Sequence, residues 1–404
     1  MSASSRILVR SFAVLVACVL ASAAVPAAGA APLACGDVIT KDTTLQSDLT
    51  DCPGDGLVVG ADGITVDLNG HSITGTGRSN GANLVYGDTE DGVDNTAGHA
   101  RVTIENGRIQ GFDTGVKLHD ANANHLTGLE LDRNLAGILP LESQGNLIER
   151  NHADQNSYGL YPYESNGNTI VDNELTGNVF GAYPVESSDN LIEGNAILFS
   201  GILGMQVVED SNRNRIVSNV IDVSGFVGVV LGGSTDNVLE DNQLTRHPGF
   251  GVIIANTART EVRDNTIGPP NSHGASPPPQ AGVTLGVSNH DVTLGRNSVT
   301  GYPIGLHLDG PETGLRVVRN QVFGNAGDGI FVGESIAGLV DRNVAHHNGD
   351  DGIDVRGSGT KLFRNLAYSN GDYGIEAVPG ADGGGNLAWG NGNPAQCLNV
   401  VCSG

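Results

Sequence analysis

The chain of 404 residues contains 59 glycines and only 4% aromatic residues, a composition typical of a turn-rich repeat protein rather than of one large globular core. Its formal net charge of -24 disfavours binding to nucleic acid or to anionic membranes, because a phosphate backbone is bound by clustered Lys and Arg. The same charge repels polyuronates unless a cation intervenes.

The first 30 residues have the features of a secretory signal peptide. Arg6 and Arg10 precede an apolar run from Phe12 to Val25, and Ala28 to Ala30 supply small residues for cleavage. We therefore expect a secreted, extracellular protein that begins near Ala31. No later apolar run is long enough to span a bilayer, so we expect no insertion into membranes.

Four cysteines lie near the two ends of the mature chain, two at each end. Export permits disulfides, and of the three possible pairings the two local ones are favoured because the intervening chain is so long. We therefore predict the disulfides Cys35–Cys52 and Cys397–Cys402. Each closes a cap that covers the unpaired strand edges at one end of a β-structure.

Between the caps, one frame returns every 22 to 24 residues. It is marked by a column of glycines: Gly115, Gly137, Gly159, Gly181, Gly204, Gly228, Gly251, Gly282, Gly305, Gly329, Gly352 and Gly374. The one long interval contains a proline-rich segment, which predicts a projecting loop over 268–281. Residues 75–100 are polar and glycine-rich and predict a second excursion loop.

A second column consists of asparagines: Asn151, Asn173, Asn195, Asn219, Asn242, Asn265, Asn297, Asn320, Asn343 and Asn365. Asn at a turn tolerates left-handed geometry, and stacked Asn side chains can hydrogen-bond along an axis. Apolar and polar residues alternate between the turns with a period of two, and such short strands cannot form separate cores. We predict an all-β fold, a single-stranded parallel β-helix of roughly 13–14 coils.

The predicted domain organisation is a signal peptide over 1–30, an N-terminal cap over 31–56, a β-helix over 57–390 and a C-terminal cap over 391–404. The lead-in CGDVITKDTTLQSDLTDC, turns of the NGDDGIDV type and the ending GGGNLAWGNGNPAQCLNVVC resemble secreted bacterial right-handed parallel β-helix repeat proteins. These belong to the pectate-lyase-like superfamily and its NosD-like carbohydrate-binding and sugar-hydrolysis repeats. The resemblance implies a right-handed helix, but lyases, epimerases, hydrolases and non-catalytic proteins share such repeats.

Positions counted from each marker glycine separate core from surface. We expect the first and third positions to face inward and the second and fourth to face solvent. In the coils from Gly115 onward, the outward positions hold Lys117, His119, Leu139, Leu141, Tyr161, Tyr163, Tyr183, Val185, Gln206 and Val208. The fifth position forms an acidic ladder of Asp120, Glu142, Glu164, Glu186 and Glu209. Stacked carboxylates repel, which raises pKa values and suits a general acid or a cation site, and tyrosines suit stacking on sugar rings. Alternatively, each Glu before Ser only caps the backbone N–H groups of its turn.

One coil resembles a strand motif of alginate C5-epimerases, Tyr-Gly-Phe-Asp-Pro-His-Asp, in the segment Tyr158 to Glu164. The Tyr, Gly and Pro match, but Tyr161 and Tyr163 stand at the Asp and His positions of the motif. The predicted catalytic residues are Lys117, His119, Asp120, Tyr158, Tyr161, Tyr163 and Glu164, and the predicted substrate-binding residues are Glu142, Tyr183, Glu186, Gln206 and Glu209.

A second acidic group near the C-terminus contains Asp328, Asp350, Asp351, Asp354, Asp372 and Glu376, and its candidate Ca²⁺ ligands are Asp328, Asp351 and Asp354. These residues lie in successive versions of one turn, which favours a structural role, and weak Ca²⁺ binding is the alternative. The sequence establishes no cofactor, and Ca²⁺ is the candidate that these carboxylates suggest.

The sequence favours a secreted polysaccharide lyase or uronate C5-epimerase that acts on the solvent face of coils 115–190. Two other functions stay open: a non-catalytic extracellular glycan-binding protein, and a glycoside hydrolase with paired carboxylates. In each case we expect the partner to be a polysaccharide or glycan.

Overall fold

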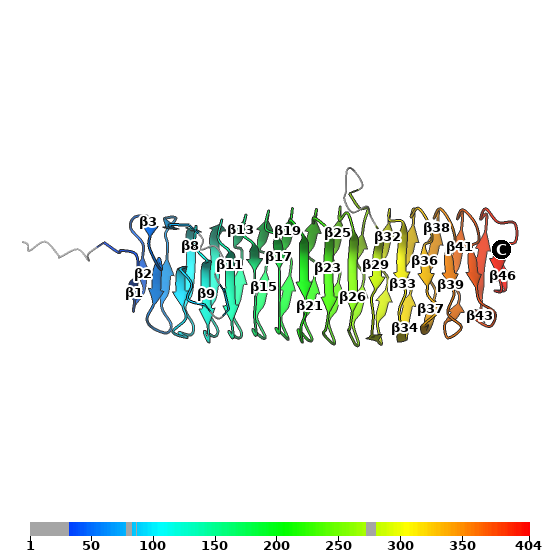
Figure 1. Ribbon diagram of the computed structural model, residues 1–404, viewed down its shortest axis with the longest axis horizontal. Coiled ribbons are helices and arrows are strands. Elements are labelled where there is room, and N and C mark those ends of the chain that lie inside the picture. Colours follow the sequence, from blue (N-terminus) through cyan, green and yellow to red (C-terminus); the bar gives the residue numbers. More distant parts are fainter. Residues whose placement is uncertain (1–31, 78–82, 86, 272–279) are drawn as a thin grey trace, which may run out of the picture. The chain divides into compact units, whose positions relative to one another are not determined.

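Short parallel strands form three rows that run along a stack of coils (Figure 1). The computed structural model describes residues 32–77, 83–85, 87–271 and 280–404. The predicted signal peptide and parts of both predicted loops lie outside these residues. Residues Leu33–Gly404 form one unit, in which the coils follow one another in chain order along a single axis. All regular elements of the described residues are strands, and none of these residues belongs to an apolar helix that could cross a membrane.

Sheet A is the first row and has 16 strands, each paired in parallel with the next coil. Its strands are β1 (Asp37–Ile39), β4 (Leu57–Val59), β7 (Asp91–Asn95), β9 (Thr114–His119), β11 (Ala136–Leu141), β14 (Tyr158–Leu160), β17 (Phe180–Ala182), β20 (Leu203–Val207), β23 (Val227–Gly232), β26 (Phe250–Ala255), β29 (Ala281–Leu285), β33 (Ile304–Leu308), β36 (Ile330–Val332), β39 (Ile353–Val355), β42 (Ile375–Ala377) and β45 (Cys397–Leu398).

The other two rows are joined by the long strands β8 (Thr103–Gln110) and β10 (His125–Asp132), which take part in both. The second row contains β2 (Thr43–Thr44), β5 (Thr65–Asp67), β12 (Leu147–Glu149), β15 (Thr169–Val171), β18 (Leu191–Glu193), β21 (Arg215–Val217), β24 (Val238–Glu240), β27 (Glu261–Arg263), β30 (Asn289–His290), β31 (Thr293–Gly295), β34 (Glu312–Val318), β37 (Ile336–Asp341), β40 (Lys361–Phe363) and β43 (Asp382–Gly384). The third row contains β3 (Leu49–Cys52), β6 (Ser72–Gly75), β13 (His152–Asp154), β16 (Glu174–Thr176), β19 (Ala196–Leu198), β22 (Val220–Asp222), β25 (Gln243–Thr245), β28 (Thr266–Ile267), β32 (Ser298–Thr300), β35 (Gln321–Phe323), β38 (Val344–His346), β41 (Leu366–Tyr368), β44 (Asn386–Trp389) and β46 (Cys402–Ser403).

The core is one continuous apolar column, as the period-two pattern predicts. The inward positions of sheet A are buried, and Val116, Leu160 and Met205 are at most 1% exposed. The marker positions require glycine because there is no room for a Cβ atom there. A Cβ on Gly159 would lie 2.6 Å from the Gly181 carbonyl oxygen and 2.7 Å from Nδ2 of Asn178. The glycine column therefore lets sheet A approach the side chains of a neighbouring turn.

The predicted asparagine column forms a hydrogen-bonded ladder that extends one coil further, to Asn386. Each Nδ2 donates to Oδ1 of the next ladder residue at 3.0–3.2 Å, and also to a carbonyl, as from Asn173 to Ile148 at 2.9 Å. The left-handed conformation falls on the residue before the asparagine, with φ of 53° at both Arg150 and Asp172. The prediction of a stacked ladder is confirmed, with the strained position one residue earlier.

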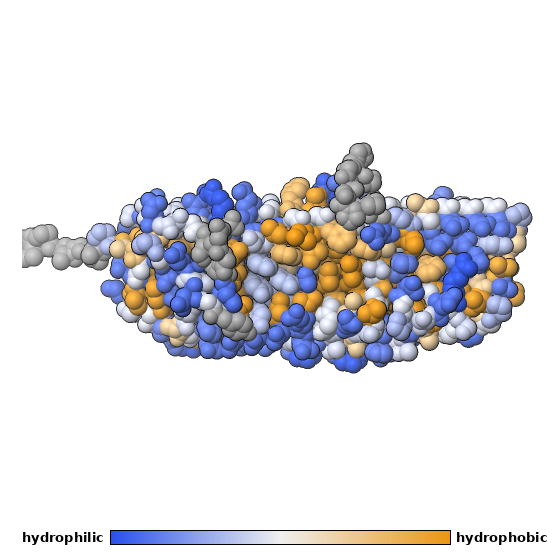
Figure 2. Space-filling model, viewed as in Figure 1, coloured by the Kyte–Doolittle hydropathy of each residue, from blue (hydrophilic) through white to orange (hydrophobic). Residues whose placement is uncertain are grey.

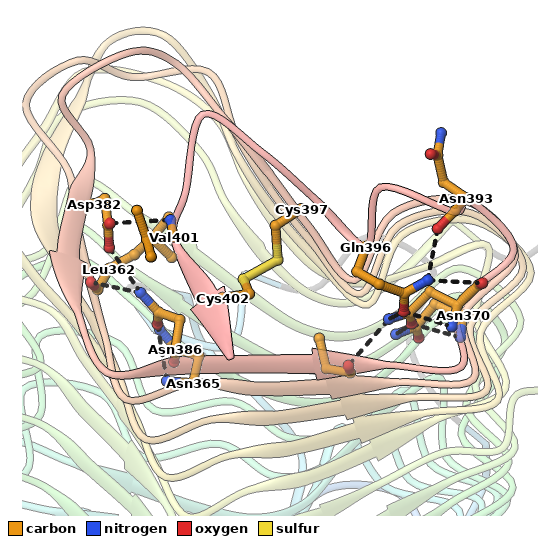
Figure 3. The surroundings of a disulfide bond; sticks show 12 residues. Leu362, Asn365, Asn370, Asp382, Asn386, Asn393, Gln396, Cys397, Val401 and Cys402 are labelled. Atoms are coloured by element: carbon orange, nitrogen blue, oxygen red, sulfur yellow. Dashed lines mark hydrogen bonds between the residues drawn. A yellow bond between two sulfur atoms is a disulfide. The ribbon is translucent and has the colours of Figure 1, made fainter. Parts of the chain in front are cut away.

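Both predicted disulfides are present, Cys35–Cys52 and Cys397–Cys402. At the C-terminal end, the disulfide lies between the ladder that contains Asn386 and another that contains Asn370 (Figure 3). Gln396 ends the latter ladder, because its Oε1 accepts hydrogen bonds from the backbone and the side chain of Asn391 at 3.0 Å. The cap thus satisfies amides that would otherwise have no further coil to bond.

The prediction of an all-β parallel solenoid is confirmed, with about 15 turns instead of roughly 13–14. Besides the twelve strands at the marker glycines, sheet A contains β1, β4, β7 and β45. Residues 75–100 are not an excursion throughout, because β7 pairs with β4 and β9 as a regular rung of sheet A. Its Gly92 precedes Gly115 by 23 residues and therefore belongs to the marker column.

Candidate functional site

The outer face of sheet A carries most of the predicted site residues, and part of it is covered. Leu84 and Val85 pack against Leu139, Leu141 and the neighbouring tyrosines. Leu139 and Leu141 are therefore 0% and 2% exposed, although they point away from the core as predicted. The expectation that all outward positions face solvent is wrong here, because Leu84 and Val85 lie over the sheet.

Beside this covered area lies a pocket of about 480 Å³. Its lining residues are Asp55, Val85, Gly87, Asp88, Thr89, Asp91, Asp94, Thr96, Lys117, His119 and Glu142. Three of the predicted site residues meet here, since Lys117, His119 and Glu142 all line it. His119 Nε2 lies 3.6 Å from Glu142 Oε1, and the predicted ladder residue Asp120 joins them in a group of three potential ligands.

Lys117 and Asp91 are linked through Thr89. The Lys117 ammonium donates to Thr89 Oγ1 at 2.8 Å, and the Thr89 hydroxyl donates to Asp91 Oδ2 at 3.0 Å. Asp91 and Lys117 are only 2% and 4% exposed. The other carboxylate oxygen, Asp91 Oδ1, is buried without a hydrogen-bond partner among the described residues. An unsatisfied buried carboxylate oxygen is costly, so it marks a place where a ligand or a proton belongs.

Burial raises the pKa of Asp91 to about 7, although the nearby Lys117 ammonium opposes this effect. Burial likewise raises the pKa of Asp55, whose Oδ1 accepts the backbone N–H of Asp91 at 2.9 Å. A carboxyl group with a pKa near neutrality can both donate and accept a proton at physiological pH. Perturbed carboxyl groups in a pocket are a recurring feature of functional sites.

These pocket carboxyls are the residues that our sequence analysis missed. We assigned Asp91 and Asp94 to an excursion loop and gave Asp55 no role. The signal was present in the repeat: with Gly92 in the marker column, Asp94 occupies the same outward position as Lys117 one coil later.

The predicted tyrosines form a stack of rings on the two coils that follow. The Tyr158 ring is stacked on Tyr161, Phe180 and Tyr183, with centroids 4.7, 5.2 and 5.7 Å away. Tyr163 meets the Tyr161 ring edge-on at 6.2 Å, and its hydroxyl lies 3.4 Å from Glu186 Oε1. Because the ring faces contact one another, a sugar would meet this platform mainly through ring edges and hydroxyl groups, which differs from the face stacking that we expected.

The acidic ladder occupies a tight turn. Asp120, Glu142, Glu164, Glu186 and Glu209 all have positive φ, between 48° and 53°. The adjacent serines cap the turn: Ser143 Oγ accepts the Ala121 N–H at 3.1 Å and donates to the Leu141 carbonyl. Burial raises the pKa of Glu164, and the neighbouring carboxylates of Glu186 and Glu142 add to the rise, as expected for stacked acids. Glu209 and Gln206 lie further along the stack and do not line the pocket.

The C-terminal acidic group lies on the same face of sheet A. Asp354 pairs in register with Glu376, and carboxylate oxygens of these two residues and of Asp351 lie within 4.8 Å of one another. Asp328, which we predicted as a ligand with Asp351 and Asp354, accepts the Asp351 N–H at 3.1 Å and is not part of this trio. Burial raises the pKa of Asp328 to about 6, and it also raises the pKa of Asp351, to which the neighbouring Glu376 carboxyl group adds.

The middle of this face is apolar (Figure 2). Outward positions there hold half-buried apolar residues: Phe180, Leu203, Val230, Phe250, Ile253 and Ile304. The pocket and the C-terminal acidic group thus lie on opposite sides of an apolar stretch of the same sheet.

The three rows of parallel strands define a right-handed parallel β-helix protein. The family model described as periplasmic copper-binding protein (NosD) matches residues 53–226 and 207–314, so the chain belongs to this family. A model described as right handed beta helix region matches residues 271–387. No curated protein sequence matches the chain.

Among solved structures, the chain resembles the periplasmic alginate epimerase AlgG with 13% identity and a TM-score of 0.51, over 70% of this chain and 76% of that one. A point mutant of the same epimerase gives 14% identity and a TM-score of 0.56, over 69% and 73%. A DFA-IIIase from Arthrobacter chlorophenolicus A6 aligns over 60% of this chain and 68% of its own, with 12% identity and a TM-score of 0.44. At these identities, the likeness to the epimerase establishes the shared fold alone.

Proposed function

We propose that the protein acts outside the cytoplasm on a polysaccharide, as a lyase or uronate C5-epimerase, with its reactive centre in the pocket between Asp91 and Lys117. The observation that carries this proposal is the pairing of a buried carboxyl of pKa about 7 with a buried ammonium in one pocket, linked by Thr89. The location outside the cytoplasm is supported by the two disulfides and by the signal-peptide pattern of residues 1–30.

Elimination and epimerisation of a uronate both begin with removal of the proton next to the sugar carboxylate. The charge that then develops on the carboxylate needs a positive group nearby. In this proposal Lys117 supplies that charge and Asp91 exchanges the proton. His119, with Glu142 beside it, is the second group able to transfer a proton. Tyr158, Tyr161 and Tyr183 lie on the following coils and form the platform for the neighbouring sugars.

The family description names copper, but the described residues do not supply a built copper site. Copper(I) favours thiolate and thioether ligands, and the four described cysteines are all in disulfides while Met205 is fully buried in the core. Among the described residues, one group of three potential ligands contains a histidine, His119 with Asp120 and Glu142, and its other members are carboxylates. We therefore derive no step through copper.

A second candidate is hydrolysis of a neutral glycan. The lining of the pocket includes five carboxyl groups against one lysine and one histidine, and such a surplus repels a uronate unless a cation accompanies it. A protonated carboxyl at Asp91 beside ionised neighbours has the arrangement that glycoside hydrolases use.

One assay separates these reactions. The mature protein is incubated with polyuronates and with neutral glycans, with and without Ca²⁺, and the products are followed by ultraviolet absorbance of unsaturated ends, by NMR and by reducing-end release. Unsaturated ends indicate a lyase, inverted C5 signals an epimerase, and new reducing ends without unsaturation a hydrolase. Binding without any product would reject the enzymatic proposal in favour of a glycan-binding protein.

Single substitutions test whether the reaction takes place in the pocket. Asp91→Asn and Lys117→Met should each lower kcat by a factor of about 100 or more, because each removes a group used in the transition state. Glu193→Gln is the matched control, an exposed carboxylate on β18 in another row, and should leave kcat unchanged. Full activity of Asp91→Asn would show that the reactive centre lies elsewhere.

A further inference from the structure

The carboxylates of Asp351, Asp354 and Glu376 come together because adjacent coils stack in register. Asp354 on β39 pairs with Glu376 on β42, and Asp351 lies in the turn just before β39. Carboxylate oxygens of the three residues lie within 4.8 Å of one another. Asp351 and Asp354 are 4% and 3% exposed, whereas the Glu376 side chain is 22% exposed and connects the group to solvent.

The hydrogen bonds of this group leave one buried oxygen unused. Asp351 Oδ1 accepts the backbone N–H of Tyr373 at 2.8 Å, and Asp354 Oδ2 accepts the Arg356 guanidinium at 2.8 Å. Asp354 Oδ1 is buried and has no hydrogen-bond partner in the described part of the chain. Burying a carboxylate oxygen without a hydrogen-bond donor costs free energy. This oxygen belongs to Asp354, which lies between Asp351 and Glu376 in the sequence. This observation is independent of the acidic cluster itself, and it favours a positively charged ligand at this position.

The charges of the neighbourhood are not balanced. Five carboxyl groups, those of Asp328, Asp350, Asp351, Asp354 and Glu376, lie around one cation in the described part of the chain, Arg356. The guanidinium reaches Asp354 directly and lies 3.7 Å from Glu376 Oε1. Like charges this close repel strongly in a poorly hydrated site, so one more positive charge would stabilise the arrangement.

The ligand chemistry and the spacing identify the kind of ion. Oxygen-only carboxylate ligands suit hard cations such as Ca²⁺ and Mg²⁺ rather than copper. Oxygens bound to one Ca²⁺ at about 2.3–2.6 Å can be up to about 5 Å apart, whereas those bound to one Mg²⁺ at about 2.0–2.1 Å are at most about 4.2 Å apart. The three carboxylate oxygens, which lie within 4.8 Å of one another, are close enough to bind one Ca²⁺ together.

We propose that Asp351, Asp354 and Glu376 form a Ca²⁺ site that ties the C-terminal coils of the β-helix together. Glu376 provides the entry for the ion, and Arg356 moderates its affinity by competing for Asp354. The site lies beyond the apolar stretch from the Asp91 pocket and does not depend on the reaction proposed there.

The test is titration of the mature protein with Ca²⁺ after removal of divalent ions by a chelator, followed by calorimetry and by thermal unfolding. We expect one Ca²⁺ per chain and a rise in Tm with Ca²⁺, with weaker binding of Mg²⁺. Asp354→Asn and Glu376→Gln should each weaken binding at least about tenfold, because each removes a charged ligand.

Arg356→Gln should act in the opposite direction and tighten binding several-fold, since it removes a competing positive charge. A merely structural role of Arg356 predicts no such gain. Glu142→Gln, in the histidine-containing acidic group at the other end of the face, is the matched control and should leave Ca²⁺ binding unchanged.

Two results would overturn the proposal. One is a wild-type protein whose heat signal and Tm do not respond to millimolar Ca²⁺. The other is loss of binding in Glu142→Gln with full binding in Asp354→Asn. Circular dichroism of each variant distinguishes loss of the site from loss of the fold.

Discussion

At the scale of single residues, burial changes the pKa of Asp91 and thereby makes the stability of the protein depend on pH. The folded-state pKa is about 7, compared with an ordinary value of 3.8. Between these two values the folded protein holds a proton that the unfolded chain has released. Stability must therefore fall as the pH rises through this window, and the stabilising contribution is complete only below it. A function in the pocket would explain why the protein keeps a buried carboxyl group that lowers its stability at higher pH.

We predict that Asp91→Asn changes the pH dependence of unfolding. The amide cannot ionise, so the difference in Tm between the variant and the wild type should become more positive from about pH 4 to about pH 8. Differential scanning fluorimetry over this range measures it, with Glu193→Gln as the exposed control. A difference that stays constant, or that becomes more negative with pH, would contradict the raised pKa.

At the scale of an element, the hydrogen-bonded ladders at the turns differ in regularity: one contains asparagine in every coil, and another is interrupted by other residue types. The column from Asn151 to Asn386 is visible in the sequence because every coil repeats the same residue. A second ladder, which includes Asn134 and Asn370, escaped our sequence analysis because Ser200, Ser224, His247 and Tyr302 interrupt it. These side chains still sit at the buried corner, where a repeat search for one residue type cannot detect them.

His247, a member of that ladder, makes the folded protein less stable at acidic pH. It is fully buried, its Nδ1 accepts the Ser224 N–H at 3.3 Å, and burial lowers its pKa from 6.5 to about 4. Between pH 6.5 and about pH 4, the unfolded chain binds a proton at His247 that the folded protein does not bind. Stability is therefore lost as the pH falls through this window, the opposite of the behaviour at Asp91.

We predict that His247→Asn, which restores the residue type of the ladder, removes this acid sensitivity. The full shift corresponds to a loss on the order of 3 kcal/mol in the wild type between neutral pH and about pH 4. Urea unfolding at several pH values gives the free energy of unfolding, and the difference between variant and wild type should shift in favour of the variant as the pH falls from neutral to about 4. Parallel curves for the two proteins would disprove the assignment.

At the scale of the whole molecule, each coil contacts mainly its neighbours, so stability is close to a sum of coil and interface contributions. The ends are then the places where unfolding starts, and the two disulfides lie there. Cys52 is also fully buried within the core column. The caps therefore protect the molecule from fraying at its ends.

Replacing Cys35 and Cys52 by Ala should destabilise the first coils by about 3 kcal/mol through lost loop entropy. Hydrogen exchange should increase over β1 to β6 and remain unchanged over β20 to β26. Removal of the Cys397–Cys402 disulfide is the matched variant and should affect β42 to β46 instead. A uniform increase over the whole chain in either variant would contradict a solenoid that unfolds from its ends.

The amino-acid sequence by itself determined the parallel β-helix, its inward positions, one asparagine ladder and both disulfides. Each depends on a local pattern that recurs on the neighbouring coils or on cysteines close in sequence. The three-dimensional structure was needed to show that Leu84 and Val85 cover Leu139 and Leu141 and that Thr89 links Asp91 to Lys117. It was also needed to show that Glu376, and not Asp328, completes the group with Asp351 and Asp354. The sites form from side chains on different coils, so they depend on which residues stack above one another. This register cannot be counted from the sequence where a loop of irregular length separates two coils.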